Sequence, residues 1–275
     1  MPSVALLAAA LLLSPPRPLP PAEVLSRLPA PEAGQGVAVD GGFVYAIGNS
    51  GIGKYDRASG ARVGRWAGDP AVVPHLNSCA VIARELVCAS SNYPVTPMSS
   101  TVEVFDPDTL QHRRSTPLGR QPGSLTWIDR HAGAWWACFA NYDGRGGEAG
   151  RDHRFTTVLR FDDRWRVTGA WTLPATVLAR FKPHGSSGGA FGADGRLYVT
   201  GHDRPEAYVL EIPRTGNELR HVATIPVAAE GQAIAFDRSR PGVLYGISRD
   251  RRELVEMRLP SLEEPRVEDS KVEGP

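Results

Sequence analysis

The chain has 275 residues, and its 31 Lys and Arg nearly balance its 30 Asp and Glu, which gives a formal net charge of +1 at pH 7. This length is sufficient for one large domain with a substantial buried core. The near-zero charge, without a block of like charges, argues against a nucleic-acid partner, because such partners need a concentrated basic surface.

Residues 1–21 are expected to be a targeting segment and linker. Residues 4–13 (VALLAAALLL) are wholly apolar, but this run is far shorter than the roughly 20 residues that span a bilayer. Its length is typical of the core of a secretory signal peptide, and the Pro-rich residues 15–21 follow as a linker. We therefore expect a secreted or periplasmic protein whose mature chain has no membrane span.

Five later stretches share one pattern: an apolar strand, a tight turn, a second strand, a polar loop and a third strand that ends in Asp or Pro. They are residues 34–56, 77–106, 123–162, 185–213 and 231–260. Their first strands start about 42, 46, 65 and 44 residues apart, close to the period of propeller blades. The pattern predicts an all-β, five-bladed β-propeller, or a six-bladed one if the long third repeat contains a further blade.

The last repeat lacks an outer strand, and the start of the chain supplies a candidate. Residues 23–40 (EVLSRLPAPEAGQGVAVD) match residues 220–237 (RHVATIPVAAEGQAIAFD) almost position for position. Residues 23–28 therefore read as an outer strand that pairs with the final blade and closes the ring, which removes a free sheet edge. The predicted domain spans residues 22–260, and the charged residues 261–275 are expected to be a disordered tail.

The three cysteines leave two interpretations open. Cys79 and Cys88 lie on consecutive strands and face each other if the hairpin turns at Ala83 and Arg84. They form either a cross-strand disulfide or a pair of buried thiols. Cys138 has no obvious partner.

A ligand site is expected where the inner strand of each blade begins and the second strand ends, since both points lie on one face around the central channel. Polar residues gather there in all five repeats, although Asn also ends strands simply because it tolerates left-handed turns. The residues assigned to ligand binding are Gln35, Asn49, His75, Asn77, Asn92, Asn141, Tyr142, Asp203, Gln232 and Arg249.

Three further residues are candidates for catalysis. Glu230 precedes Gly231 where an inner strand enters the channel, so partial burial could adapt it to acid–base work. His184 and His202 flank the first two strands of the fourth repeat and could relay a proton or bind a metal. No established ligand spacing supports a metal, so none is predicted, and no cofactor is identified. The insertion at residues 142–155 reads as a flap over the pocket or as a solvated loop.

The repeat resembles the broad superfamily of secreted YVTN-like and SMP-30-like propellers, which includes lactonases and muconate-lactonising cycloisomerases. A narrower similarity is to plant-type glutaminyl cyclotransferases, which are five-bladed. Gln35 in AGQGVAVD resembles that family's TQGL segment, and TGHDRP (residues 200–205) resembles its TGKxWP segment. Here His202 replaces the family's lysine and Arg204 its tryptophan. The resemblance implies cyclising or ring-opening chemistry.

Three functions remain open. The first is an extracytoplasmic propeller that binds a small polar ligand, such as a sugar or a peptide end, in its central channel. The second is a ring-opening or cyclising enzyme of the lactonase, cycloisomerase or glutaminyl cyclotransferase type, with Glu230 as acid–base and His202 or His184 orienting the substrate. The third is a protein-interaction scaffold, which a polar rim poor in aromatic residues disfavours. A small-molecule or peptide partner and a monomeric state are expected.

Overall fold

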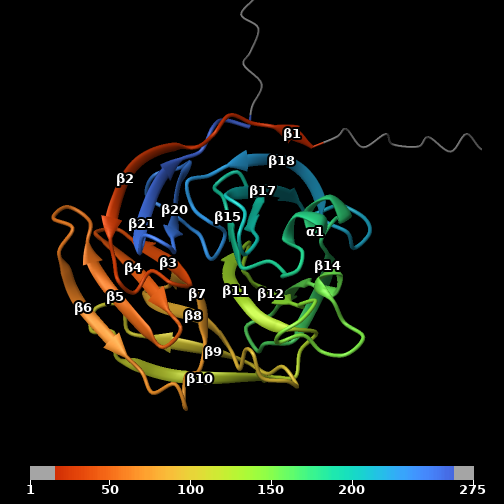
Figure 1. The fold of residues 1–275 in the computed structure, drawn as a ribbon, viewed down its shortest axis with the longest axis horizontal. Coiled ribbons are helices and arrows are strands. Elements are labelled where there is room, and N and C mark those ends of the chain that lie inside the picture. Colours follow the sequence, from red (N-terminus) through yellow and green to blue (C-terminus); the bar gives the residue numbers. More distant parts are fainter. Residues whose placement is uncertain (1–15, 263–275) are drawn as a thin grey trace, which may run out of the picture.

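The computed structural model describes residues 16–262, which form five sheets arranged in a ring (Figure 1). The predicted five-bladed β-propeller is therefore confirmed, and the long third repeat forms a single blade. Residues 1–15 of the expected targeting segment and linker (residues 1–21) and residues 263–275 of the expected tail (residues 261–275) lie outside the described residues.

The blades are numbered here in chain order, with strands given from the channel outward. Blade 1 consists of β3 (Gly36–Asp40), β4 (Phe43–Gly48), β5 (Gly51–Asp56) and β6 (Arg62–Ala67). Blade 2 consists of β7 (Leu76–Ile82), β8 (Glu85–Ser91), β9 (Ser100–Phe105) and β10 (His112–Gly119). Blade 3 consists of β11 (Ser124–His131), β12 (Ala134–Ala140), β13 (Thr157–Phe161) and β14 (Val167–Thr172).

Blade 4 consists of β15 (Gly188–Phe191), β16 (Leu197–Thr200), β17 (Glu206–Glu211) and β18 (Arg220–Pro226). Blade 5 consists of β19 (Ala235–Phe236), β20 (Val243–Ser248), β21 (Glu253–Arg258) and β2 (Glu23–Pro29). The strand β2 pairs antiparallel with β21, from Glu23 opposite Arg258 to Pro29 opposite Glu253. The predicted closure of the ring by an N-terminal strand is confirmed.

The core is divided among five hydrophobic clusters, one at each junction between neighbouring blades. Inner strands such as β3 are almost wholly buried, whereas outer strands such as β6 alternate between exposed and half-buried residues. This is the arrangement expected when each sheet packs face to face on the next and only its outer edge meets solvent. All six tryptophans pack in these inter-blade clusters.

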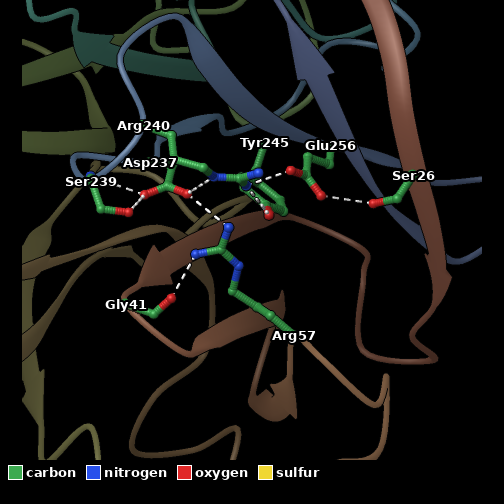
Figure 2. Close-up of polar contacts among 8 residues, drawn as sticks. All are labelled: Ser26, Gly41, Arg57, Asp237, Ser239, Arg240, Tyr245 and Glu256. Atoms are coloured by element: carbon green, nitrogen blue, oxygen red, sulfur yellow. Dashed lines mark hydrogen bonds and ion pairs between the residues drawn. The ribbon is translucent and has the colours of Figure 1, made fainter.

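Polar contacts join blade 5 to blade 1 at the seam where the ring closes (Figure 2). Arg57 of blade 1 donates to the Asp237 carboxylate at 2.7 Å and to the Gly41 carbonyl oxygen. Arg240 donates to Asp237 and to Glu256, and Glu256 accepts a 2.8 Å hydrogen bond from the Ser26 hydroxyl of β2. The closing strand is thus linked to the first blade by a continuous set of charged groups.

Three segments outside the four-stranded pattern are ordered. The strand β1 (Arg17–Pro18) pairs parallel with β18, so the expected linker contains a fifth strand for blade 4. The insertion at residues 142–155 carries a 3-10 helix, η1 (His153–Phe155), and the helix α1 (Ala175–Phe181) lies between blades 3 and 4. Within residues 16–262, no helix is long and apolar enough to cross a membrane.

Cys79 and Cys88 form a disulfide across β7 and β8, which decides between the two interpretations of these cysteines. The hairpin turns at Ala83 and Arg84, whose φ angles are 49° and 63°. Two successive positive φ angles are typical of the type I′ turn that joins tightly paired strands. Cys138 is buried and has a free thiol.

Candidate functional site: a cavity at the centre of the ring

A cavity of about 480 Å³ opens where the inner strands begin and the second strands end, and all five blades contribute to its lining. Nine of the thirteen predicted site residues line it. They are Gln35, Asn49, His75, Asn77, Tyr142, His184, His202, Gln232 and Arg249. The topological rule that inner and second strands meet at one face therefore located the cavity.

One wall of the cavity is a chain of aromatic rings that runs from blade 2 to blade 4. The ring centroids of His75 and Tyr93 are 5.3 Å apart, and those of Tyr93 and Tyr142 are 5.1 Å apart. Tyr142 contacts His184 edge-on at 6.4 Å, and His184 stacks on His202 at 4.1 Å. The expectation of a rim poor in aromatic residues is wrong, because neighbouring blades bring together rings that lie far apart in the sequence.

Two Asn-Tyr pairs show how the chain builds this wall. Asn92-Tyr93 follows β8, and Asn141-Tyr142 follows β12, so the pairs occupy equivalent positions in blades 2 and 3. Asn92 donates to the Pro97 carbonyl oxygen and accepts from the Ser99 backbone N–H. Asn141 is buried and donates to the Pro122 and Phe155 carbonyl oxygens. Each Asn therefore holds loop backbone in place and does not line the cavity, whereas each Tyr does.

The remaining wall is made of amide side chains fixed by neighbours. Gln35 donates to the Asn49 side-chain oxygen at 2.7 Å, which joins the two polar ends of blade 1. Asn77 is buried and donates to the Leu125 carbonyl oxygen at 2.7 Å. Gln232 has a φ of 65° and donates to the His202 carbonyl oxygen at 3.3 Å. These bonds preorganise the amides before a ligand arrives.

His202 lies between a carboxylate and a guanidinium. Its Nδ1 is 2.5 Å from Asp203 Oδ1, and its Nε2 is 3.3 Å from Arg249 Nη1. An ionised carboxylate only accepts hydrogen bonds and a guanidinium only donates them, so Nδ1 carries the proton and Nε2 presents a lone pair. Burial, with added repulsion from His184 and Arg249, lowers the pKa of His202, although the bond to Asp203 opposes this.

Asp203 is exposed and does not line the cavity, contrary to its assignment as a ligand-binding residue. Its second carboxylate oxygen is 3.5 Å from His184 Nδ1, so one carboxylate contacts both stacked imidazoles. Burial raises the pKa of Asp203, but the hydrogen bond and charge of His202 and the charge of His184 outweigh it and leave the pKa lowered. Asp203 therefore orients the two imidazoles from outside the cavity.

His75 is the half-buried imidazole at the blade 2 end of the aromatic wall. Burial, together with the positive charge of Arg249, lowers its pKa to about 4, against a hydrogen bond to the Asn77 side chain that raises it. His75 is consequently neutral at neutral pH. It can then donate one hydrogen bond and accept another.

Glu230, which the sequence suggested as the acid–base group, does not line the cavity. Its carboxylate accepts from the Ser248 hydroxyl at 3.2 Å and from the Arg249 backbone N–H at 3.0 Å. These bonds hold the chain after β20 and so position the Arg249 side chain. The next residue, Gly231, has a φ of 60°, and a Cβ there would lie 2.5 Å from the Gly201 and His202 carbonyl oxygens.

Six lining residues were not among the predicted site residues, and one of them is Arg145 in the insertion at residues 142–155. The others are Pro74, Tyr93, Pro94, Thr126 and Ser187. The insertion is anchored rather than free: Glu148 accepts from the Met98 backbone N–H, and Asp143 accepts from the His153 backbone. Arg145 had no signal in the sequence, because an insertion has no counterpart in the other repeats. Thr126 and Ser187 do lie within repeats, where their positions in or before inner strands could have identified them.

Two groups of side chains among the described residues could bring three ligand atoms within 4.8 Å of one another. One is His184, His202 and Asp203, and the other is Asp143, Asp152 and His153. In both groups, a carboxylate already hydrogen-bonds to an imidazole of the same group.

Comparison with solved structures shows the β-propeller fold and nothing finer. The PQQ-bound aldose sugar dehydrogenase of Streptomyces coelicolor matches with a TM-score of 0.53 and 14% identity, over 87% of this chain and 81% of that chain. The hydrazine synthase of Kuenenia stuttgartiensis matches at 0.46 and 11%, over 81% and 82%. The WD40 propeller domain of Doa1 matches at 0.45 and 12%, over 82% and 63%. No protein-family model and no curated protein matches the chain, so the resemblance to YVTN-like, SMP-30-like and glutaminyl cyclotransferase propellers is not confirmed.

Proposed function

We propose that this chain binds a small polar ligand in the central cavity of its propeller. The observation that carries the proposal is the cavity itself, about 480 Å³ in volume and lined from all five blades. That volume lies within the range of small-molecule sites, which combine apolar or aromatic walls with a few convergent polar groups. The aromatic wall and the fixed amides of Gln35, Asn77 and Gln232 are such a combination.

A protein-interaction scaffold has less support in the part of the chain that the structure describes. The large apolar side chains exposed there lie on separate elements. They are Val24, Val63, Val72, Val95, Phe155 and Val167. Scattered apolar residues of this kind are normal on protein surfaces, whereas interaction sites gather them.

A catalytic role for the same cavity is favoured by one specific observation, the His202–Asp203 pair. The carboxylate fixes the proton on Nδ1, so Nε2 can accept a proton from a ligand hydroxyl or amine that takes the place of the Arg249 guanidinium beside it. Ring opening and cyclisation both need such a base. In this second candidate function, His202 is the base, Asp203 orients it and Glu230 positions Arg249.

We also propose an extracytoplasmic location. The Cys79–Cys88 disulfide supports it, because disulfides persist in oxidising compartments and are rare in the cytosol. The apolar run at residues 4–13 points the same way. Fractionation of cells that express the full chain, with the disulfide state measured in each fraction, tests this location.

A thermal-shift screen of the full chain tests ligand binding. The panel contains sugars, lactones, small organic acids, phosphate esters and peptides with N-terminal glutamine. A ligand at one hundred times its Kd stabilises the fold by about 2.7 kcal/mol, which raises the melting temperature measurably. The shift should disappear in Gln35→Ala, which loses a cavity amide, and persist in Val63→Ala, on the outer strand β6.

The absence of a thermal shift with every ligand of the panel, or equal shifts in the two variants, would contradict binding in the cavity. For the catalytic candidate, His202→Gln should abolish turnover of any ligand that shifts the wild type while leaving its shift largely intact. Turnover that survives in His202→Gln would remove this residue as the base.

A further inference from the structure

We propose, resting on the proposed function, that the ligand of the central cavity is a small organic oxyanion, bearing a carboxylate or phosphate group that binds between Arg249 and Arg145. The first observation is the charge of the lining. Two arginines and three histidines line the cavity, and no Asp or Glu does.

The second observation is that neither guanidinium is neutralised. Many arginines within residues 16–262 pair with carboxylates, for example Arg57 with Asp237, but neither Arg145 nor Arg249 forms an ion pair there. The guanidinium of Arg249 donates to the Nε2 of His202, which is an uncharged acceptor in the arrangement derived above. The Glu230 carboxylate binds the backbone N–H of Arg249 and so leaves its guanidinium available.

The third observation is that the positive charge of Arg249 affects the pKa of histidines in two other blades. Arg249 lowers the pKa of His75 in blade 2 and that of His202 in blade 4, in addition to the effect of burial on each. An unpaired guanidinium in a partly enclosed site is the usual partner of carboxylate and phosphate groups, which match its planar fork of donors. A positive cavity of this kind also disfavours a divalent cation at His202, 3.3 Å from the guanidinium.

The aromatic wall indicates that the anion has a carbon skeleton. Tyr93 and Tyr142 line the cavity edge to face, and Tyr93 is also packed against Gly146, beside Arg145. Aromatic surface gains little from a bare hydrated ion but packs well on a small carbon framework. The skeleton would therefore lie along the tyrosines while the anionic group meets the guanidinium groups.

Protonation gives the proposal a second signature. An anion in the cavity raises the pKa of His75 and of His202, so binding takes up protons and strengthens as the pH falls from 7 to 5. The groups that face His75 are Tyr93, Asn77 and Arg249, and those that face His202 are His184, Asp203 and Arg249. Asp203 has a lowered pKa and stays ionised over this range.

The test compares matched pairs of probes at constant ionic strength: gluconate with glucose, glycerate with glycerol, and glucose 6-phosphate with glucose. Thermal shift and titration calorimetry are measured on the full chain. We expect the charged member of a pair to bind and its neutral counterpart not to. The carboxylate and phosphate arms then show which oxyanion is preferred.

Variants assign the binding to the arginines. Arg249→Gln and Arg145→Gln keep hydrogen-bond donors but remove the charge, and each should weaken binding of the anionic probe by about 10-fold to 100-fold. Arg84→Gln, in the exposed turn between β7 and β8, is the matched control and should leave binding unchanged. Calorimetry in buffers of different ionisation enthalpy should detect proton uptake at pH 6.

Neutral probes that bind as well as their charged counterparts, or anion binding that is unchanged in both arginine variants, would overturn the oxyanion inference and leave the proposed function standing. Absence of binding by every probe in both this set and the wider thermal-shift panel would overturn the proposed function, and the oxyanion inference with it.

Discussion

Arg57 of blade 1 and Asp237 of blade 5 form an ion pair at 2.7 Å across the seam where the propeller closes. The Asp237 side chain is only 2% exposed, and Arg240 and Ser239 also donate to it. A buried carboxylate with three donors is favourable only while all of them stay in place, because an unpaired buried charge is costly. Protonation of Asp237 at low pH should therefore destabilise the seam.

Acid should weaken the fold through Asp237. Burial raises its pKa, but the hydrogen bonds from Ser239 and Arg240 and the charge of Arg57 outweigh it and lower the pKa to about 2. A folded-state pKa below the unfolded value contributes stability above pH 4 that is lost as the pH falls towards 2, here about 2 kcal/mol. Urea unfolding at several pH values measures this. Asp237→Asn should be less stable at pH 7 and have a shallower acid dependence, and an unchanged acid slope would contradict the assignment.

His75 should weaken the fold at higher pH than Asp237 does. Its folded-state pKa of about 4 lies below the ordinary value near 6.5, so the unfolded chain binds the proton more readily than the native one. The resulting stability is complete above pH 6.5 and is lost progressively down to pH 4, by at most about 3 kcal/mol. Chemical denaturation at pH 7 and pH 4.5, in the wild type and in His75→Gln, isolates this contribution. The unfolding free energy of His75→Gln should not show this loss between pH 6.5 and pH 4.

Gly231→Ala should disturb the cavity much more than the same change at Gly242. Both glycines have positive φ, 60° and 78°, so alanine is strained at each by about 1 kcal/mol. At Gly231 the new methyl group would also lie 2.5 Å from backbone oxygens, whereas at Gly242 nothing lies within 4 Å. We expect Gly231→Ala to cost at least about 3 kcal/mol in unfolding free energy and to abolish ligand binding. Similar melting temperatures for the two variants would show that the loop can move aside.

A thiol assay of the denatured chain should detect one free thiol without reductant and three after reduction. The single thiol belongs to Cys138, since Cys79 and Cys88 are bridged. The bridge closes a short loop, which by chain-entropy arguments contributes about 2 to 3 kcal/mol. Replacing both bridged cysteines with serine should lower the unfolding free energy by about that amount. Three thiols without reductant would mean that the bridge does not form.

The fold could be predicted because propeller blades repeat. Turn residues such as Asp40-Gly41-Gly42 mark the hairpins, and the likeness between residues 23–40 and 220–237 revealed the closing strand. The same repetition located most of the cavity, since the position of Gln35 or His75 before an inner strand depends on topology alone. The repeat pattern could not, however, predict the hydrogen-bond partners of individual side chains.

The errors at the site have specific physical causes. Asn92 and Asn141 lie beside tyrosines that do line the cavity, but their amides donate to carbonyl oxygens of loop residues, Pro97 and Pro122 respectively. The sequence gives no sign that the Glu230 carboxylate has partners, but in the structure it accepts two hydrogen bonds, from Ser248 and from the Arg249 backbone. Arg145 lies in an insertion whose path depends on tertiary contacts, such as that between Gly146 and Tyr93.

The closing strand has a consequence for the order in which the protein can fold. Ser26 of β2 bonds to Glu256 of β21, 230 residues later in the chain. The pairing can form only after nearly all of the domain has been synthesised, and contacts of such long range form slowly. Until then β21 has an unpaired edge that could pair with another chain, so the period before closure is when this propeller is most prone to aggregation.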